Sequence, residues 1–401
     1  MDSLELMRAL SQPSPSKIVF CVLDGLGGLP HPKTGKTELE TARTPNLDRL
    51  ATSGVCGLAE VVGAGITPGS GAGHLALFGY DPLRFIIGRG VLEAVGIDFN
   101  LEPKDIAARG NFCTVDEAGL VTDRRAGRIL NDLCAELCQL FDGMVIDGVK
   151  ILVRPVREHR FVIVFRGGGL NAEVSDSDPQ QIGVAPKVVT ALEPKAASLA
   201  SVANEFIIRA KKILVEPYPA NMVLLRGFSQ RPKLPSIADI YKLKPTAIAV
   251  YPMYRGLARL IGMEILKTGN SIDEEFITLS RNYADHDFFF LHVKWPDSAG
   301  EDGDFDRKVK VIEEFDKALA EAINLEPDVM VVTGDHSTPA ALKRHSWHPV
   351  PVLVYSKWCR PDRAVEFSES ACLCGGLGHF PATQIMSQAM AQALKLTKYG
   401  A

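Results

Sequence analysis

The sequence predicts an α/β protein with a doubly wound sheet and a second α/β domain inserted into the chain. Short apolar runs without polar alternation are typical of strands buried on both faces of a parallel sheet. Polar loops follow these runs, and helical patterns separate them, as expected for this class of fold. The middle of the chain is richer in arginines beside turns than either end. We therefore expect one domain from residues 1–85 and 246–401, with residues 86–245 as the insert.

The composition argues against some classes of binding partner. The chain has 401 residues, of which 46% are hydrophobic, so it can bury a large core. Its formal net charge of -4, spread over both signs, gives no basic surface for nucleic acid or an acidic membrane. The first residues lack a basic segment followed by a long apolar run, and no later stretch has the length of a membrane span. We expect a cytoplasmic protein with neither partner, and the oligomeric state stays open.

The eight cysteines show no repeated CxxC spacing. Cys134 with Cys138, at helical spacing, and Cys372 with Cys374 could pack in the core or bind zinc. We favour packing, and reduced thiols fit the cytosol.

The first predicted strand is KIVFCVL at Lys17–Leu23, and it ends at Asp24 in DGLGG. Open α/β sheets bind ligands at the carboxyl ends of their strands. Asp24 is therefore a candidate ligand, although a lone acid can also cap a helix or form a turn. A helix beginning at Thr44-Pro45 and ending at Ser53 follows, and then a strand at Val55–Val62.

That strand leads to TPGSGAGH at Thr67–His74, which offers one hydroxyl, Ser70, on a glycine-rich turn before a predicted helix. Glycines let the backbone approach a ligand closely, and the free N–H groups of a helix start favour an anion. The stretch therefore suits a phosphate group beside Ser70. A serine is a weak nucleophile at neutral pH, so a base or a metal ion must lower its pKa.

Cationic residues recur in the predicted insert. One group lies at the start of a predicted helix and another directly precedes the predicted strand Phe161–Phe165. Arginine binds carboxylate and phosphate through a planar fork of donors, so these groups could form a pocket for a small anion. The alternative is a set of surface salt bridges. The two groups are Arg124, Arg125 and Arg128, then Arg157, His159 and Arg160.

Residues 176–194 are rich in turn formers and predict an exposed loop. The helical periodicity of Leu199–Ile213 follows it.

From about Thr246 the pattern of strand, polar loop and helix returns. The strand Asp287–Val293 is followed by a predicted polar loop that contains Asp297 and Glu301. The other predicted elements are a strand at 247–252, helices at 254–266 and 274–283, a helix at Phe305–Ile323, strands at Val329–Val332 and Val350–Tyr355, and a helix at Pro381–Leu394.

Four loops next to these strands carry oxygen and imidazole ligands without a thiolate, which suits Mn, Zn or Mg. Two cations about 3.5–4 Å apart can activate an alkoxide and hold phosphoryl oxygens. The acid and histidine of TGDHSTP could instead be a cap and a turn residue, and the histidines of KRHSWHPVP could be surface groups. We expect a site for two metals around Ser70. The candidate ligands are Asp24, Asp297, Glu301, Asp335, His336 and His345.

Several motifs together resemble the cofactor-independent phosphoglycerate mutases, specifically the archaeal-type branch of the alkaline phosphatase superfamily. The resemblance spans nearly the whole chain. It implies a phosphatase-like α/β domain made from both termini and an inserted domain with substrate contacts. The motifs are VLDGLGG, TPNLDRLA, TPGSGAGHLALFGYDP, GRG, RGNFCTVD, DRRAGR, HRFVIVFRG, HVKWPDSAGEDGD, VVTGDHSTP and HSWHPVP.

The resemblance also implies residue roles. Ser70 matches the phosphate acceptor and, with Asp24, Asp335 and His336, the ligands of one metal. Asp297, position 301 and His345 match the ligands of the other. The implied substrate contacts are Arg124, Arg125, Arg128, His159, Arg160 and Arg255.

Two positions depart from the family pattern. Glu301 stands where the family usually has His, and Arg255 stands where it tends to have Lys. Glu can ligate Mn or Zn through oxygen, so we expect a working site with an altered metal preference. Arginine and lysine both hold phosphoryl groups, with different geometry.

The resemblance implies conversion of 3-phosphoglycerate to 2-phosphoglycerate through a phosphoserine. It requires two divalent metal ions (Mn, Zn, Mg or Co) and no 2,3-bisphosphoglycerate. Arginines of the insert are expected to bind the carboxylate and exclude water, and an aspartate or histidine of the insert to move the proton. The alternatives are a metal-dependent phosphomonoesterase or phosphonate hydrolase, and a non-enzymatic protein in which Glu301 marks a decayed site.

Overall fold

The computed structural model describes residues 2–215 and 218–400, which divide into two compact units. Unit 1 comprises residues 1–86 and 234–401, and unit 2 comprises residues 87–233. The chain thus returns to unit 1 at Leu234, earlier than the predicted boundary at residue 246. The short helix α8 (Ile237–Tyr241) accounts for the difference: Tyr241 is buried, and its hydroxyl donates a hydrogen bond to the carbonyl of Phe78 in unit 1.

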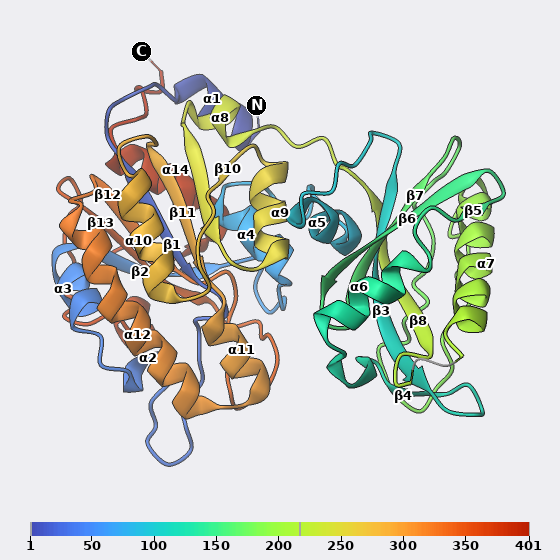
Figure 1. Ribbon diagram of the computed structural model, residues 1–401. Helices are drawn as coiled ribbons and strands as arrows, with labels where there is room; N and C mark the ends of the chain where they lie inside the picture. Colours follow the sequence, from blue (N-terminus) through green and yellow to red (C-terminus); the bar gives the residue numbers. More distant parts are fainter. Residues whose placement is uncertain (1, 216–217, 401) are drawn as a thin grey trace. The chain divides into compact units, whose positions relative to one another are not determined.

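Unit 1 is built on an eight-stranded sheet in which every strand but one, β13, runs in the same direction (Figure 1). Its central strands are wholly buried, as expected for unalternated apolar runs covered on both faces. The strands in spatial order are β10 (Glu264–Ile265), β9 (Pro245–Ala249), β11 (Phe288–Val293), β1 (Ile18–Leu23), β12 (Val329–Thr333), β13 (Val350–Ser356), β2 (Val55–Glu60) and β14 (Gly378–Pro381).

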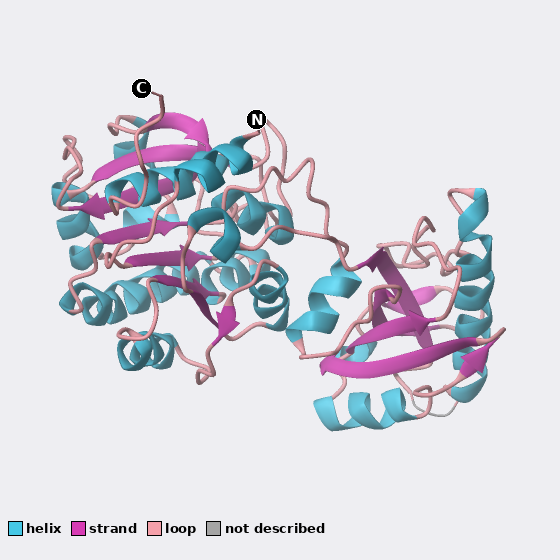
Figure 2. Cartoon of the chain, turned by 90° about the horizontal axis from the view of Figure 1, so that it is seen from above, coloured by secondary structure: helices cyan, strands magenta, loops and turns pink. Residues whose placement is uncertain are grey.

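Helices cover both faces of this sheet, as Figure 2 shows in cyan. On one face, Val19 and Cys21 of β1 pack in a core with Phe276 and Phe315 of the amphipathic helices α10 and α12. On the other face, the ring of Phe20 lies 6.3 Å from that of Phe78, at the end of α4. The helices are α1 (Ser3–Leu10), α2 (Glu38–Thr41), α3 (Pro45–Ser53), α4 (Ser70–Leu77), α8, α9 (Pro252–Leu260), α10 (Ile272–Asn282), α11 (Trp295–Asp302), α12 (Phe305–Asn324), α13 (Glu369–Leu373), η3 (Ala382–Gln384) and α14 (Ile385–Gln392).

Unit 2 is an antiparallel sheet packed against helices. Strand β3 lies at its centre, between β7 and β8, and the order continues from β7 to β6 and β5. Phe112 of β3 and Phe206 of α7 belong to one apolar core. The elements are α5 (Arg89–Gly96), β3 (Ile106–Val115), β4 (Val121–Asp123), η1 (Ala126–Arg128), α6 (Asn131–Gln139), β5 (Val145–Ile146), β6 (Val149–Arg157), β7 (Arg160–Arg166), η2 (Pro194–Ala196), α7 (Ala197–Ile213) and β8 (Met222–Gln230).

The predicted fold class is confirmed, but some local predictions are wrong. The segment after β11 is the helix α11 rather than a loop, with a proline in its first turn and the left-handed Gly303 at its end. The predicted exposed loop 176–194 buries Ser177 and Asp178. The helix predicted at 254–266 ends at Leu260, and the last helix begins at Ile385.

The cysteines carry no bridge: all eight are free. Cys134, Cys138 and Cys372 are buried, whereas Cys374 is exposed. Among the described helices, none combines the length and the apolar character that crossing a membrane requires.

Candidate metal centre

Three neighbouring parallel strands of unit 1 bring acidic and imidazole side chains to one edge of the sheet. Asp24 directly follows β1, Asp335 and His336 follow β12, and Asp297 lies on α11 after β11. Because β1 lies between β11 and β12, the three segments meet although they are hundreds of residues apart in sequence. The carboxyl ends of parallel strands are where open α/β sheets bind ligands.

The first cluster consists of Asp24, Asp335 and His336, which are all fully buried. Nε2 of His336 lies 3.2 Å from Oδ1 of Asp24 and 3.2 Å from Oδ2 of Asp335. No well-aligned hydrogen bond reaches these two buried oxygens in the described part of the chain, although imidazole nitrogens lie 3.2 Å away. A divalent metal ion bound here would satisfy both oxygens, so the cluster fits such an ion.

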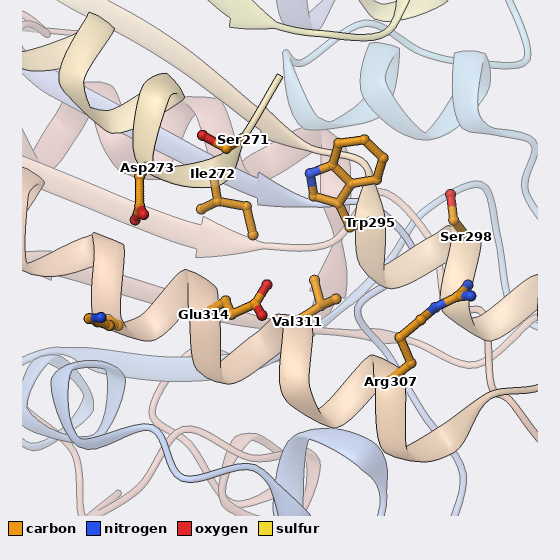
Figure 3. Close-up of a pocket in the computed structure, with 9 residues that line it drawn as sticks. Ser271, Ile272, Asp273, Trp295, Ser298, Arg307, Val311 and Glu314 are labelled. Atoms are coloured by element: carbon orange, nitrogen blue, oxygen red, sulfur yellow. The ribbon is translucent and has the colours of Figure 1, made fainter. Parts of the chain in front are cut away.

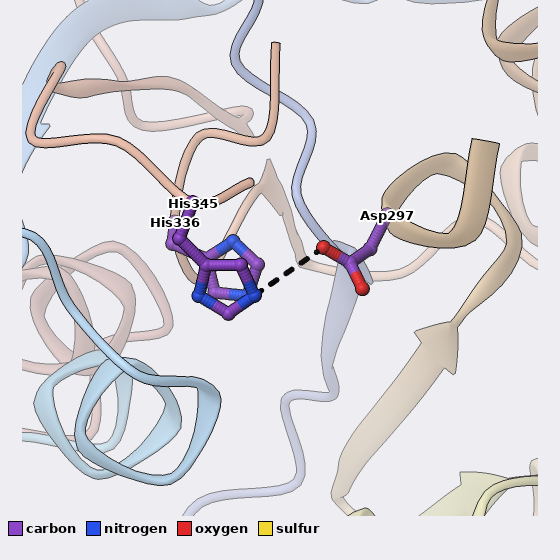
Figure 4. Close-up of side chains that lie close together, drawn as sticks. All are labelled: Asp297, His336 and His345. Atoms are coloured by element: carbon purple, nitrogen blue, oxygen red, sulfur yellow. Dashed lines mark ion pairs between the residues drawn. The ribbon is translucent and has the colours of Figure 1, made fainter. Parts of the chain in front are cut away.

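The second cluster consists of Asp297, His336 and His345 (Figure 4). Nε2 of His345 lies 3.6 Å from Oδ1 of Asp297, and the rings of His336 and His345 stack with centroids 3.6 Å apart. Nδ1 of His345 lies 3.0 Å from the carbonyl oxygen of Pro68, which can only accept, so this nitrogen donates and Nε2 is the nitrogen that faces Asp297. The Thr338 hydroxyl donates to Asp297 Oδ1 over 2.7 Å. Such outer contacts orient metal ligands.

Ser70 is the first residue of α4, and its Oγ lies 3.2 Å from Nε2 of His336, the residue common to both clusters. The helix start leaves free N–H groups beside this hydroxyl. The close approach of α4 to the Asp335 loop needs Gly73, because a Cβ at that position would lie 2.2 Å from the carbonyl oxygen of Asp335. The glycine-rich turn therefore places Ser70 next to the clusters.

The electrostatics of the clusters favour positive charge. Burial alone would lower the pKa of His336, yet the carboxylates of Asp335 and Asp24 raise it to about 9. Burial alone would raise the pKa of Asp24, yet Lys294 and His292 hold it well below its usual value. Protons and metal ions compete for such donors, so an anionic pocket that retains protons is also a pocket that binds cations.

Sequence reasoning missed Lys294, which connects the two clusters. Its Nζ lies 3.0 Å from Oδ2 of Asp24 and also contacts Oδ2 of Asp297. Tyr254 was missed too, and its hydroxyl donates to Asp24. His74 lies on α4 with Nδ1 3.2 Å from Asp335 Oδ2. Lys294 stands three residues before Asp297 in the motif HVKWPD, and this spacing was the sequence signal that could have indicated a contact between them.

Two predicted residues of unit 1 lie outside both clusters. Glu301 is exposed on the last turn of α11 and belongs to neither group. Arg255 lies on α9, partly buried, next to Tyr254.

The predicted cationic residues of unit 2 form a group of their own. Burial lowers the pKa of His159 to about 3, and the charges of Arg160, Arg109, Arg125 and Arg128 act in the same direction. Arg109 was not predicted. Arg124, in contrast, binds Asp178 through two hydrogen bonds of 3.1 and 2.7 Å. For Arg124 the structure thus shows a salt bridge, which is the alternative to an anion pocket that the sequence left open.

A separate hollow of about 690 Å³ lies between α10, α11 and α12 (Figure 3). Trp295 and Ser298, which flank Asp297 on α11, line it together with Arg307. None of the predicted site residues is among its lining residues.

The fold and the site define a class: a doubly wound α/β protein whose serine hydroxyl lies beside oxygen and imidazole donors, an arrangement that suits metal-assisted phosphoryl transfer. Residues 51–219 match the family model described as 2,3-bisphosphoglycerate-independent phosphoglycerate mutase. A probable mutase of this kind from Thermosipho melanesiensis is 48% identical over 100% of both chains, and one from Deinococcus radiodurans is also 48% identical over 100% of both. The chain therefore belongs to the 2,3-bisphosphoglycerate-independent phosphoglycerate mutase family.

Solved structures agree with this assignment. A protein from Pyrococcus horikoshii is 27% identical with a TM-score of 0.84, and the match covers 96% of this chain and 99% of that one. The cofactor-independent phosphoglycerate mutase from Thermoplasma acidophilum is 28% identical with a TM-score of 0.69, and covers 94% and 100%.

Proposed function

We propose that the chain interconverts 3-phosphoglycerate and 2-phosphoglycerate, with Ser70 as the phosphate acceptor. The observation that carries the proposal is the position of the Ser70 hydroxyl, 3.2 Å from the histidine that both ligand clusters share. The names of the relatives support the choice of substrate. The cytoplasm is the proposed compartment.

The residues present fit two divalent cations, with Mn, Zn, Mg and Co as the candidates. One set would be Asp24, Asp335 and His336 together with Ser70, and the other Asp297 and His345. When bound, the ions would lower the pKa of the serine hydroxyl and neutralise phosphoryl oxygens. Glu301 does not enter this proposal, because its side chain is exposed and lies outside both clusters.

The chain's own groups have distinct tasks. The Ser70 oxygen attacks phosphorus while the bond from phosphorus to the 3-oxygen of the substrate breaks, which leaves a phosphoserine and glycerate. The N–H groups at the start of α4 stabilise the charge on the phosphoryl oxygens. Lys294 offsets the negative charge of Asp24 and Asp297. The substrate carboxylate is proposed to bind to arginines, with the neutral His159 as a further hydrogen-bonding group. The proposed arginines are Arg124, Arg125, Arg128, Arg160 and Arg255.

A mutase differs from a phosphatase in the fate of the phosphoserine. Glycerate must stay bound and present its 2-hydroxyl to phosphorus, while water is kept away. An aspartate or histidine of the insert is proposed to move the proton between the two hydroxyls.

Two assays on the Mn-loaded full-length chain test the proposal. With 3-phosphoglycerate and no 2,3-bisphosphoglycerate, an enolase-coupled assay should report 2-phosphoglycerate, and a parallel assay should find little inorganic phosphate. Steady phosphate release without 2-phosphoglycerate would instead establish a phosphomonoesterase that uses the same serine. Absence of both products would contradict each enzymatic proposal.

A further inference from the structure

Lys308 is a fully buried lysine in a helix whose neighbouring cations are exposed. It lies in the first turn of α12, and its side chain is 0% exposed, whereas that of Lys310 on the same helix is 74% exposed. Removing an ammonium group from water is costly unless its donors are satisfied. The hydrogen-bond partners of the Lys308 ammonium therefore indicate its role.

The Lys308 ammonium connects two loops that carry proposed metal ligands. Its Nζ donates to the carbonyl oxygen of Gly27 over 3.1 Å and to that of Thr338 over 2.9 Å. Gly27 lies three residues after Asp24, and Thr338 lies two residues after His336. One cation thus holds the loop after β1 and the loop after β12 by their backbones.

Carboxylates beneath the same loops complete this support. Oε1 of Glu38 accepts a hydrogen bond of 2.8 Å from the backbone N–H of Ala340 and lies 4.0 Å from Lys308 Nζ. Glu38 is fully buried, so the cation of Lys308 offsets its charge. Oε1 of Glu369 accepts 2.9 Å from the N–H of Gly28. Each of the two loops is therefore held both by the ammonium of Lys308 and by a carboxylate.

The two loops are also bonded to each other, so displacement of one changes the position of ligands in the other. The N–H of Thr338 lies 3.2 Å from the carbonyl oxygen of Gly25 and 3.1 Å from that of Gly27. The N–H of Gly25 donates to Oδ1 of Asp335 over 3.1 Å. Without the ammonium, the two carbonyl oxygens of Gly27 and Thr338 would each lose a donor in a buried environment.

We propose that Lys308 is a positioning residue, which fixes the spacing of the two loops so that Asp24, Asp335 and His336 can bind a divalent cation together. The inference rests on the proposed metal-dependent function. The hydrogen bonds of Lys308 go to the backbone of the loops rather than to the clustered ligands, so it acts through that backbone.

The test compares Mn²⁺ binding to the ion-free full chain with binding to Lys308→Met, which keeps an unbranched side chain of nearly the same length and removes its donors. Titration should show Mn²⁺ affinity reduced about 10–100-fold, the usual effect of removing an outer-shell partner. The increase in Tm on adding Mn²⁺ should shrink in parallel. Lys308→Arg, which keeps the cation, should bind more tightly than Lys308→Met. Lys310→Met, on the same helix, should bind Mn²⁺ as the unaltered chain does.

A purely structural role predicts a different pattern: a lower Tm for ion-free Lys308→Met with unchanged Mn²⁺ affinity in the folded protein. That pattern would overturn the inference. If Lys308→Met does not fold, Glu38→Gln decides. This variant keeps an acceptor for the Ala340 N–H but removes the negative charge opposite Lys308. Weakening of Mn²⁺ binding by about tenfold would support the inference. An Mn²⁺ affinity equal to that of the unaltered chain would overturn it.

The outcome is separable from that of the proposed function. An unaltered chain that binds Mn²⁺ without turnover contradicts the mutase proposal and leaves the Lys308 comparison intact. An unaltered chain that binds no Mn²⁺ contradicts both.

Discussion

The two units of the molecule concentrate opposite charges by different structural means. Unit 1 collects Asp24, Asp297 and Asp335 at the ends of parallel strands, where their oxygens lie close together. Unit 2 collects arginines on an antiparallel sheet and its turns, around the buried His159. Because β1 lies between β11 and β12, the acids of unit 1 come from segments hundreds of residues apart, whereas the cationic group of unit 2 comes from residues 109–160.

The two charge distributions favour different kinds of ligand. Clustered buried carboxylate oxygens favour cations, and guanidinium groups favour carboxylate or phosphate. Changes in unit 1 should therefore impair chemistry and metal binding, and changes in unit 2 should impair substrate affinity and stability in acid.

The largest effect is expected from Ser70→Ala in unit 1. Without the hydroxyl there is no phosphate acceptor, so kcat should fall by at least about 10⁴-fold in the enolase-coupled assay. Mn²⁺ should remain largely bound, because the carboxylate and imidazole donors are unchanged. Ser53→Ala, at the end of α3, is the matched control and should keep full activity. Retention of more than a small fraction of the activity in Ser70→Ala would remove the residue from its role.

A smaller effect is expected from Arg128→Met in unit 2. A charged hydrogen bond contributes about 1.5–3 kcal/mol, so loss of a carboxylate contact should lower kcat/KM by about 10–150-fold, mainly through KM. Mn²⁺ affinity should not change, which distinguishes the two units. Arg209→Met, an exposed arginine on α7 of the same unit, provides the control. Equal kinetic constants for the two variants would contradict a substrate-binding role of Arg128.

Acid should weaken unit 2 through His159. Burial and the adjacent arginines lower the pKa of His159 to about 3, so the folded form holds the ring neutral while the unfolded chain protonates near pH 6.5. Stability is then lost as the pH falls below about 6.5, by about 2 kcal/mol at pH 5. His159→Gln should lose less stability between pH 7 and pH 5 in denaturant unfolding. An identical pH dependence in both proteins would rule out this origin of acid sensitivity.

The smallest effect is expected at Glu275 of unit 1, on the buried face of α10. Burial raises the pKa of Glu275 well above its usual value, and its Oε2 has no partner in the described part of the chain. A raised pKa means that its stabilising contribution is complete below about pH 4.5 and is lost as the pH rises. Glu275→Met should therefore increase stability, by about 1 kcal/mol at pH 8 and by less at pH 5. Melting curves at the two pH values check this, and a larger gain at pH 5 would contradict it.

Much of unit 1 could be predicted because its strands are apolar and unalternated. Val19 and Cys21 pack on one face of β1 and Phe20 on the other. Since both faces are buried, the strand reads as a continuous apolar run, which is the pattern of a central strand. The acids that follow such runs are easily recognised in the sequence, and the structure places Asp24, Asp297 and Asp335 in two clusters that share His336.

Other features gave weaker signals. Strand β14 pairs only with β2 at the edge of the sheet and is mostly exposed, so it has no apolar run. Helix α11 contains turn formers, although its early Pro296 and the terminal Gly303 are the signals that mark helix ends. Lys308 differs in no sequence property from Lys310, and only the tertiary packing separates the two.

The central position of β1, between β11 and β12, has a consequence for synthesis on the ribosome. The insert is one continuous stretch that ends at residue 233, so it can fold while later residues are still being made. The first strand must wait for partners that are encoded about 270 and 310 residues further along. During translation the amino-terminal segment is therefore an unpaired apolar strand for most of the elongation time, and is the part of the nascent chain most in need of a chaperone.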